Sequence, residues 1–265
     1  MLLYPRSRFA LALRSPVGIT ARPAPVPVIA FAVRHVSSAL DVNTSGAQAE
    51  PTPKGVKLTA HQQYHAARLT PASLPADPLV LFRTWLEEAL TAVREPEAMT
   101  LCTSTPSGVP SARAVLLKEV DERGFLFFTN YASRKARELA ANPHAALAMH
   151  WRELARQVRV VGAVEKVSRE DSEAYFATRP RGSQLGAWAS AQSSVVGEGE
   201  LEKAVQEVEK RFADADVPCP PGWGGYRVVP TEIEFWAGQP SRLHDRFVYL
   251  REAEGRPWRV ERRAP

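Results

Sequence analysis

The first segment with a clear hydrophobic pattern is LPADPLVLFRTWLEEALTAVREP, at residues 74–96. Its hydrophobic positions recur every three or four residues, at Leu81, Phe82, Trp85, Leu86 and Ala89. That spacing places them on one face of an α-helix. Asp77 is a suitable N-cap, and Pro78 suits the first helical position. The pattern predicts an amphipathic helix that begins at Pro78.

From Met99 onward the pattern changes to short strand-like runs. MTLCTSTPSGVPSARAVLLKEV holds two runs around a Pro-Ser-Gly turn, and FLFFTNY follows the turn DERG. AALAMHW and RQVRVVGAVEKV come next, and the chain closes with YRVVP, TEIEFWAG, SRLHDRFVY and PWRVERRAP. Each run is bounded by turn-forming residues, as expected for strands.

Three helices interrupt these strands. SRKARELAANP has Ser133 as its cap, SREDSEAYFATRP has Ser168, and residues 199–213 form the third. Strands outnumber helices and follow one another without strict β-α-β alternation. The fold class is therefore expected to be α+β, mostly β: an antiparallel barrel or meander with helices packed outside it.

The N-terminal segment differs from the rest of the chain in its content of charged residues. Residues 1–40 contain five Arg, no Lys and no acidic residue, which is typical of an organelle transit peptide, most simply mitochondrial. The alternative is a disordered tail on a cytoplasmic protein. Residues 41–60 are polar, with Pro and Gly, and are predicted to be a flexible linker before a domain at 61–265.

The remaining residues carry 29 basic and 29 acidic side chains. This balance argues against a nucleic-acid partner, which needs a basic surface for phosphates. No segment is predicted to cross a membrane. The motifs GxGxxG after a strand, GxxxxGK[ST] and GxSxG do not occur. His61 and His65 stand in HQQYH, which lacks the glutamate of HExxH, so no metal site is predicted.

Two cationic segments are candidates for binding an anion. In SARAVLLKEV, Arg113 and Lys118 are an odd number of positions apart, so a regular strand would direct them to opposite faces. Either the strand is bulged or the two bind different ligands. Solvated cations on an edge strand are the simpler alternative. In ASRKARE, Arg134 and Lys135 occupy the first helical turn, where cations oppose the helix dipole. A phosphate at the free N–H groups there would offset that cost, although surface charge is equally plausible.

A second phosphate-like set lies in AYFATRPRGSQLGAW. Tyr175 and Arg179 are four residues apart and are expected to share a helix face that Pro180 ends. Ser183 is expected to cap the next helix, whose N–H groups would attract an anion. Ordinary capping explains Ser183 equally well. Gln192 and the serines after it offer further neutral donors nearby.

The last candidate is SRLHDRFVY. Arg242, His244 and Arg246 fall at every second position and would share one face of an extended strand. Trp236 is an even number of positions before Arg242 and would share that face in a continuous strand, although Gly238 and Pro240 can break the strand between Trp236 and Arg242. An aromatic ring with two Arg and one His suits a flat, electron-rich ligand. Because no side chain has the features of a nucleophile, a cofactor is expected to carry the chemistry.

These segments together resemble the pyridoxamine 5′-phosphate oxidases, FMN enzymes that make pyridoxal 5′-phosphate. The resemblance covers about residues 60–265 and rests on an ordered set of motifs: LPADP, RAVLLK, FFTNYASRKARELAANP, RQVRVVGAVEK, YFATRPRGSQLGAW with QSS, WGGYRV, IEFW and RLHDR. RPRGSQLGAW and RLHDR are highly specific in combination.

The resemblance implies an FMN-binding split barrel that acts as a homodimer with FMN at the subunit interface. The implied FMN-binding residues are Arg113, Ala114, Val115, Leu116, Leu117, Lys118, Phe128, Thr129, Arg134, Lys135, Gln157, Gln192, Ser193, Trp236 and Arg246. The implied substrate-binding residues are Lys118, Tyr175, Arg179, Ser183, Arg242, Leu243 and His244. Arg242 and His244 would be the catalytic pair beside the carbon that is oxidised.

The implied reaction is oxidation of pyridoxamine or pyridoxine 5′-phosphate by O2, the final step of vitamin B6 cofactor synthesis. Hydride passes from C4′ to flavin N5, O2 is reduced to H2O2, and the amine substrate also releases NH3. One departure from the family is His61, where an Arg is common in the segment that covers the site. The alternatives are a split-barrel flavin enzyme acting on another substrate and a non-catalytic flavin or pyridoxal phosphate carrier.

Overall fold

The computed structural model describes residues 63–265. The expectations for 1–40, for the linker and for His61 therefore lie outside the described residues, and they stay predictions. The described part contains one sheet of nine strands: β1 Ala98–Ser104, β2 Pro110–Leu116, β3 Glu119–Val120, β4 Phe125–Asn130, β5 His144–Trp151, β6 Arg156–Lys166, β7 Trp223–Ala237, β8 Asp245–Leu250 and β9 Arg259–Arg262. The helices are α1 Pro78–Ala92, α2 Arg134–Ala141, α3 Arg169–Ala177, α4 Arg181–Ala189 and α5 Glu200–Arg211, with 3₁₀ turns at Pro71–Ser73, Arg152–Leu154 and Pro240–Arg242.

Every strand pair in the sheet is antiparallel, and the order is β2-β1-β5-β6-β7-β4-β3. β8 pairs with β7, and β9 extends the sheet from β8. β7 pairs with β4 along its first half and with β8 along its second half, and β6 pairs with it from Tyr226 to Ala237. The predicted α+β class with an antiparallel sheet is confirmed.

β7 corrects the expectation that YRVVP and TEIEFWAG form two strands. It continues through Pro230 because a register shift at Val161/Gly162 lies opposite the proline, which has no N–H to donate. A Cβ on Gly162 would lie 2.1 Å from the Val229 carbonyl oxygen, so the close approach there requires glycine. The bulge lets one strand turn with the sheet instead of ending.

The predicted helix starts are confirmed by their caps. Asp77 accepts a hydrogen bond from the Leu79 amide (2.9 Å), and α1 begins at Pro78. Ser133 caps α2, and Ser168 caps α3 through the Asp171 amide (2.9 Å). The hydrophobic face of α1 packs on the sheet through buried aromatic pairs, Phe82 with Phe125 and Trp85 with Phe235.

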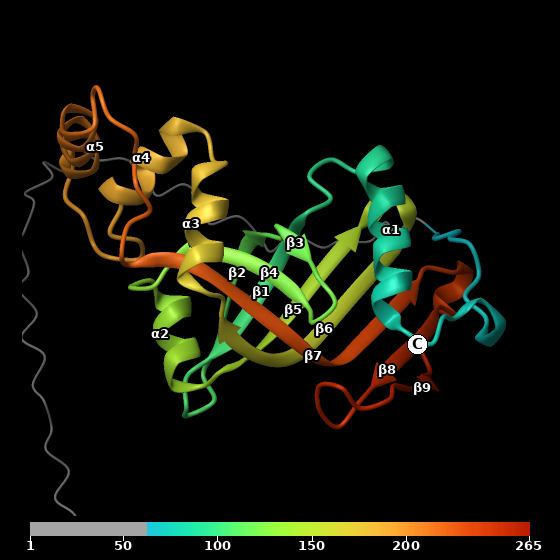
Figure 1. Ribbon diagram of the computed structural model, residues 1–265. Helices are drawn as coiled ribbons and strands as arrows, with labels where there is room; N and C mark the ends of the chain where they lie inside the picture. The colour runs from blue at the N-terminus through green and yellow to red at the C-terminus, as the bar shows by residue number, and fades with distance from the viewer. Residues whose placement is uncertain (1–62) are drawn as a thin grey trace, which may run out of the picture. The chain divides into compact units, whose positions relative to one another are not determined.

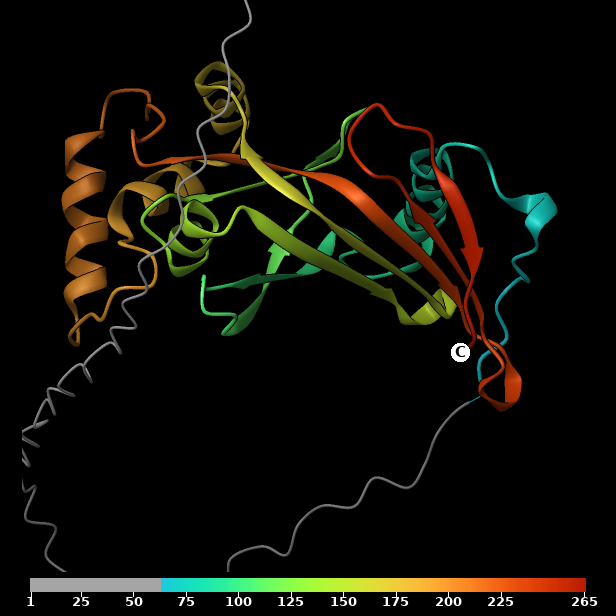
Figure 2. The same ribbon diagram turned by 90° about the horizontal axis from the view of Figure 1, so that it is seen from below.

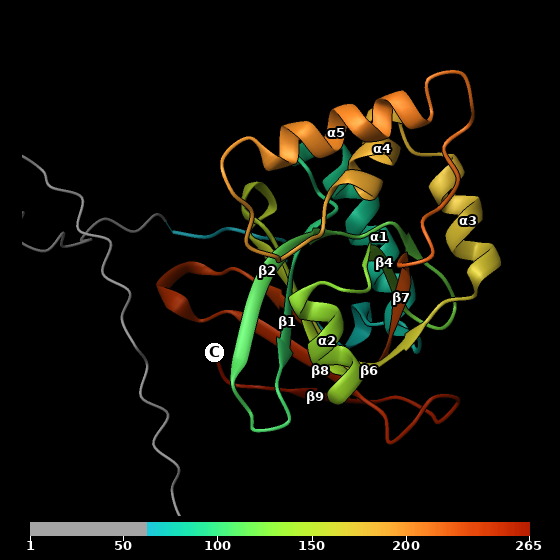
Figure 3. The ribbon, with the colours of Figure 1, turned by 90° about the vertical axis from the view of Figure 1, so that its left-hand side faces the viewer.

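The helices lie at both ends of the sheet. Figure 1 shows α3, α4 and α5 gathered at one end, with α1 and the β8–β9 pair toward the other, and Figure 2 shows the same separation from below. α5 runs across α4 (Figure 3), and the two share a small hydrophobic core that includes Leu185, Phe212 and Trp223. Among the described residues, none of the helices has the length and apolar content needed to span a bilayer.

Candidate active site

The N-terminus of α2 holds a buried cation. Lys135 is 7% exposed, and its ammonium donates to Gln192 Oε1 (3.0 Å), Thr129 Oγ1 (3.2 Å) and Ser133 Oγ (3.5 Å). All three acceptors are neutral. Burial, together with the charge of Arg113, lowers the pKa of Lys135. A buried ammonium without a carboxylate partner among residues 63–265 is a place where an external anion would be stabilised.

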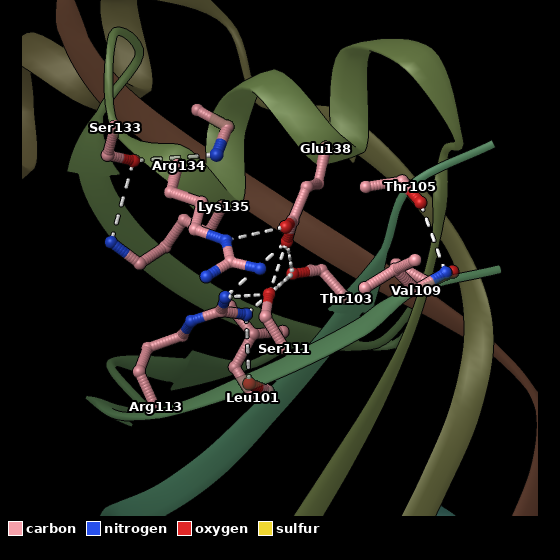
Figure 4. Close-up of polar contacts among 12 residues, drawn as sticks. Leu101, Thr103, Thr105, Val109, Ser111, Arg113, Ser133, Arg134, Lys135 and Glu138 are labelled. Atoms are coloured by element: carbon pink, nitrogen blue, oxygen red, sulfur yellow. Dashed lines mark hydrogen bonds and ion pairs between the residues drawn. The ribbon is translucent and has the colours of Figure 1, made fainter. Parts of the chain in front are cut away.

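Two arginines beside Lys135 converge on one carboxylate, that of Glu138 (Figure 4). Arg134 Nε donates to Glu138 Oε1 at 2.9 Å, and Arg113 Nη2 lies 3.4 Å from Oε2. The hydroxyls of Thr103 and Ser111 donate to Oε2, each at 2.5 Å. Burial alone would raise the pKa of Glu138, but the hydrogen bonds from Ser111, Thr103 and Arg134 outweigh it and hold that pKa at about 2.

The structure shows that Arg113 and Lys118 are directed to different places without a bulge in the strand. β2 is not bulged and ends at Leu116. Arg113 lies on the face of β2 that meets α2, where it also donates to the Leu101 carbonyl (3.1 Å). Lys118 follows the strand and reaches a different cavity. Leu117 is 5% exposed within the main core and does not line this cavity.

That cavity, the Arg179 pocket, has a volume of about 220 Å³. Its lining is Ala114, Val115, Leu116, Lys118, Phe128, Thr129, Lys135, Tyr175, Arg179, Gln192 and Trp223. Most of the cofactor residues predicted from the first half of the chain therefore share one pocket with Lys118, Tyr175 and Arg179, which were predicted to bind the substrate. Arg179 Nη1 is buried and has no hydrogen-bond partner within residues 63–265. An orphaned guanidinium donor in a pocket indicates a missing anionic ligand.

One wall of the Arg179 pocket is an aromatic stack. The rings of Phe128 and Tyr175 lie 4.0 Å apart and nearly parallel, and Trp223 stacks on Phe128 at 5.5 Å. The Arg179 guanidinium lies over Trp223, 4.8 Å from the ring centre. Sequence reasoning missed Trp223, although an aromatic residue directly before the pair Gly224-Gly225 was a usable signal. It also missed Glu138, whose spacing four residues after Arg134 indicates a helical ion pair.

Two expectations around Pro180 are wrong. α3 ends at Ala177, so Arg179 follows the helix instead of sharing a face with Tyr175, because the residue before a proline disfavours helical geometry. α4 begins at Arg181 with Pro180 at the N-cap position, and the Pro180 carbonyl accepts from the Ser183 amide (2.8 Å). Ser183 is exposed in the first turn, is not the cap, and does not line the Arg179 pocket.

A second group of predicted residues lies around the C-terminal end of β7. Gln157, Trp236 and Arg246 stand directly opposite one another on β6, β7 and β8. Arg246 makes a two-pronged ion pair with Glu234, with distances of 2.9 and 3.0 Å. The hydrogen bonds that Arg246 donates to the Glu234 carboxylate raise the pKa of Arg246.

Arg242 and His244 are not in a strand, which corrects the expectation that they share a strand face with Arg246. β8 begins at Asp245, because Pro240–Arg242 forms a 3₁₀ turn in which Ser241 and Arg242 have φ of 57° and 63°. Consecutive left-handed non-glycine residues are costly and are retained where geometry matters, as at functional sites. Leu243, the third predicted residue here, is 69% exposed.

This turn forms the Arg242 pocket, about 180 Å³ in volume, which is lined by Gln63, Tyr64, Gln239, Arg242 and His244. The Gln239 amide donates to His244 Nδ1 (3.0 Å), so Nδ1 is an acceptor and the ring proton is on Nε2. Tyr64 packs edge-on against Trp236 (5.3 Å) and His244 (5.9 Å). Gln63 and Tyr64 were not predicted as site residues.

The two pockets lie at opposite ends of β7. Trp223, its first residue, lines the Arg179 pocket, and Trp236 packs beside His244 near its other end. The strand has 15 residues, a length of up to about 50 Å at roughly 3.3 Å per residue. One chain therefore does not bring Arg242 and His244 to Arg179. Ser193 is exposed, has φ of 72°, and does not line the Arg179 pocket.

The fold and the paired pockets define a split-barrel protein. The structure of a pyridoxamine 5′-phosphate oxidase-related, FMN binding protein from Nostoc punctiforme has the same fold, with a TM-score of 0.57, 17% identity, and coverage of 74% of this chain and 98% of that one. PhzG from Burkholderia lata, solved with tetrahydrophenazine-1-carboxylic acid, has a TM-score of 0.70 and 32% identity, covering 76% and 99%. The predicted split barrel is confirmed.

Sequence comparison gives the family. Residues 86–212 match the pyridoxamine 5′-phosphate oxidase family, and 223–265 match the pyridoxine 5′-phosphate oxidase C-terminal dimerisation region. The pyridoxine/pyridoxamine 5′-phosphate oxidase of Rubrobacter xylanophilus is 55% identical over 206 residues, which are 77% of this chain and 94% of that protein. This chain belongs to the pyridoxamine 5′-phosphate oxidase family and is an oxidoreductase, as the motifs predicted.

Proposed function

We propose that this chain uses FMN and O2 to oxidise pyridoxamine 5′-phosphate or pyridoxine 5′-phosphate to pyridoxal 5′-phosphate. The observation that carries the proposal is a pair of cations in one pocket, neither of which has a carboxylate partner among the described residues. Lys135 is buried, and all of its hydrogen-bond acceptors among the described residues are neutral. Arg179 has a buried N–H donor with no partner among those residues. Two such positions suit two phosphorylated ligands lying side by side.

The residues present fit FMN, the cofactor that family membership supports. Lys135, Arg134 and Arg113 would hold its phosphate at the start of α2, where helix N–H groups add to their charge. The strand residues Ala114–Leu116 with Phe128 and Thr129 would flank the flavin ring. When bound, FMN supplies a two-electron acceptor that takes hydride from the substrate C4′ and passes the electrons to O2, giving H2O2.

Lys118, Tyr175 and Arg179 would bind the substrate phosphate. Holding that phosphate fixes the pyridine ring, so C4′ is presented to the flavin in one orientation and less entropy is lost in reaching the transition state. For pyridoxamine phosphate the balance is substrate plus O2 plus water giving aldehyde, NH3 and H2O2. For pyridoxine phosphate no water is consumed and no NH3 is released.

A homodimer would complete the site. Residues 223–265 match a dimerisation region, and they include Trp236, Arg242, His244 and Arg246. Because these residues lie at the far end of β7 from Arg179, a second copy would have to present them to the Arg179 pocket. We propose that FMN binds at this interface, with Arg242 orienting the substrate and His244 donating through Nε2.

PhzG suggests a second candidate, oxidation of a tricyclic carboxylic acid. Its resemblance to this chain is closer in fold than that of the Nostoc protein, but at 32% identity it is more distant than the Rubrobacter oxidase at 55%. Either substrate would place its anionic group at Lys118 and Arg179, because the position at the start of α2 is assigned to FMN. Lys118 beside Arg179 supplies more positive charge than a single carboxylate uses, which favours a phosphorylated substrate.

The full-length chain can be purified, examined for the yellow flavin spectrum, and mixed with pyridoxamine 5′-phosphate in air. We expect H2O2, NH3 and aldehyde absorbance in equal amounts. Arg179→Ala should retain flavin and lose most turnover at low substrate concentration. The proposal is wrong if the flavin-loaded chain leaves both vitamin B6 phosphates unoxidised, and activity on tetrahydrophenazine-1-carboxylic acid alone would establish the second candidate.

The composition of residues 1–40 supports a proposed mitochondrial location, with the cytoplasm as the alternative. Fusing these residues to a fluorescent protein tests this directly. Import should be lost when the five arginines are replaced by glutamine. Diffuse fluorescence from the unaltered fusion would contradict the proposal.

A further inference from the structure

Glu138 has an unusual position for a carboxylate beside an anion site. It is 6% exposed on α2, and within residues 63–265 it is the ion-pair partner of both Arg113 and Arg134. Figure 4 shows both guanidinium groups directed at it from different elements. A buried acid next to a phosphate would ordinarily repel the ligand, so its presence needs a physical reason.

The geometry of the contacts supplies that reason. Glu138 takes Nε of Arg134, which leaves both Nη groups of that arginine for another acceptor. Thr103 on β1 and Ser111 on β2 hold Oε2 in place, and Ser111 Oγ also accepts from Arg113 Nη2. The carboxylate therefore fixes two long, flexible cations that would otherwise lose much side-chain entropy on gripping a ligand.

Charge counting supports the same role. Arg113, Arg134 and Lys135 bring three positive charges to the start of α2, and Glu138 reduces the sum to two. A phosphate monoester carries about −1.5 to −2 at pH 7. With Glu138 ionised, the bound site is close to neutral, and the low pKa of Glu138 keeps it ionised through the physiological range.

We propose that Glu138 is a positioning residue that orients Arg134 and Arg113 for the FMN phosphate without touching the ligand itself. This inference rests on the proposed function, because it assigns the α2 cradle to FMN. It differs from a purely structural role, in which Glu138 only ties α2 to β1 and β2. A structural role affects every ligand of the pocket equally, whereas a positioning role affects only ligands that carry the phosphate.

The test compares FMN with riboflavin, which lacks the phosphate. The flavin-free full-length protein and its Glu138→Gln variant are titrated with each ligand, and binding is followed by quenching of flavin fluorescence. We expect FMN to bind the variant about tenfold more weakly, equivalent to about 1.4 kcal/mol. Riboflavin affinity should change by less than about twofold, because riboflavin has no phosphate for Arg134 and Arg113 to bind and its uncharged contacts are unaltered.

Glu173→Gln is the matched control. Glu173 is the i+4 partner of Arg169 on α3 through the same Nε–Oε1 contact, at 2.7 Å, and it is 56% exposed. Its removal should leave the ratio of FMN to riboflavin affinity unchanged. If Glu138→Gln does not fold, Ser111→Ala removes one hydroxyl that holds the carboxylate and should lower the ratio several-fold.

An unchanged ratio in Glu138→Gln overturns the inference, whether both affinities fall together or neither moves. Tighter FMN binding also overturns it, because repulsion would then outweigh orientation. A wild-type protein that binds FMN no better than riboflavin contradicts the proposed α2 cradle itself. The two proposals therefore fail in distinguishable ways.

Discussion

Replacing Lys135 by methionine separates binding from stability. Lys135 is buried, its pKa is lowered first by burial and then by Arg113, and its hydrogen bonds in the structure go to neutral acceptors. Burying the ammonium therefore disfavours folding of the flavin-free protein below the unfolded pKa near 10.5. Methionine has a similar length and no charge. We expect the flavin-free variant to unfold at the same temperature as wild type or higher.

The same change should weaken FMN binding strongly. A hydrogen bond to a charged group is worth about 1.5–3 kcal/mol, and 1.4 kcal/mol is a tenfold change in affinity. Loss of the Lys135 contact therefore predicts a roughly ten- to hundredfold increase in the FMN dissociation constant. Flavin fluorescence quenching measures the affinity, and calorimetry of the flavin-free protein measures the unfolding temperature.

Lys203→Met on the exposed face of α5 is the control for removing one positive charge, and it should change neither quantity. FMN affinity within twofold of wild type in Lys135→Met would refute the assignment of this lysine to the phosphate. An unfolding temperature lowered by more than about 4 °C, roughly 1–2 kcal/mol for a domain of this size, would refute the claim that its burial is costly.

Three further predictions follow from the site. Arg242→Leu should slow single-turnover flavin reduction while FMN affinity stays near wild type; reduction at the wild-type rate would remove Arg242 from substrate orientation. When Arg179→Ala and Arg242→Leu chains are mixed, about a quarter of wild-type activity should be recovered. Random pairing makes half of the dimers mixed, and one of the two sites in each mixed dimer is intact. No recovery would show that the two residues act within one chain. Glu138 has a folded pKa of about 2 against a usual 4.5, so its contribution to stability is present above pH 4.5 and is lost as the pH falls toward 2. The difference in unfolding free energy between wild type and Glu138→Gln should shrink over that range, and a pH-independent difference in denaturant titrations would contradict the assignment.

Local patterns predicted the elements well because local physics determines them. Asp77, Ser133 and Ser168 each cap the expected helix, since a short polar side chain can satisfy N–H groups two or three residues ahead. The continuity of β7 could not be predicted, because Pro230 lies at a register shift between β7 and β6, where it faces Gly162, 68 positions earlier in the chain. That continuity depends on pairing between distant segments.

The site was predicted in its parts but not in its arrangement. Motif resemblance identified Lys135 and Arg179, and the structure places both in one pocket. The spacing from Arg134 gave no reason to choose Glu138 over another acid in a helical ion pair, because its importance comes from Thr103 and Ser111 on neighbouring strands. The turn at Arg242 was taken for a strand, since alternating polar residues do not reveal left-handed backbone geometry.

The separation of the two pockets means that one chain cannot hold the active site proposed above. β7 makes the Arg179 pocket at one end with Trp223 and supports the Arg242 pocket at the other with Trp236. A rigid strand cannot fold back to join them, and the bulge at Gly162 turns the sheet without reversing it. Two copies related by a twofold axis solve this geometry, because each would bring its Trp236 end to the Trp223 end of the other. Dimerisation would then be a condition for catalysis as well as for stability, and dilution to monomers should abolish turnover even where the flavin phosphate stays bound.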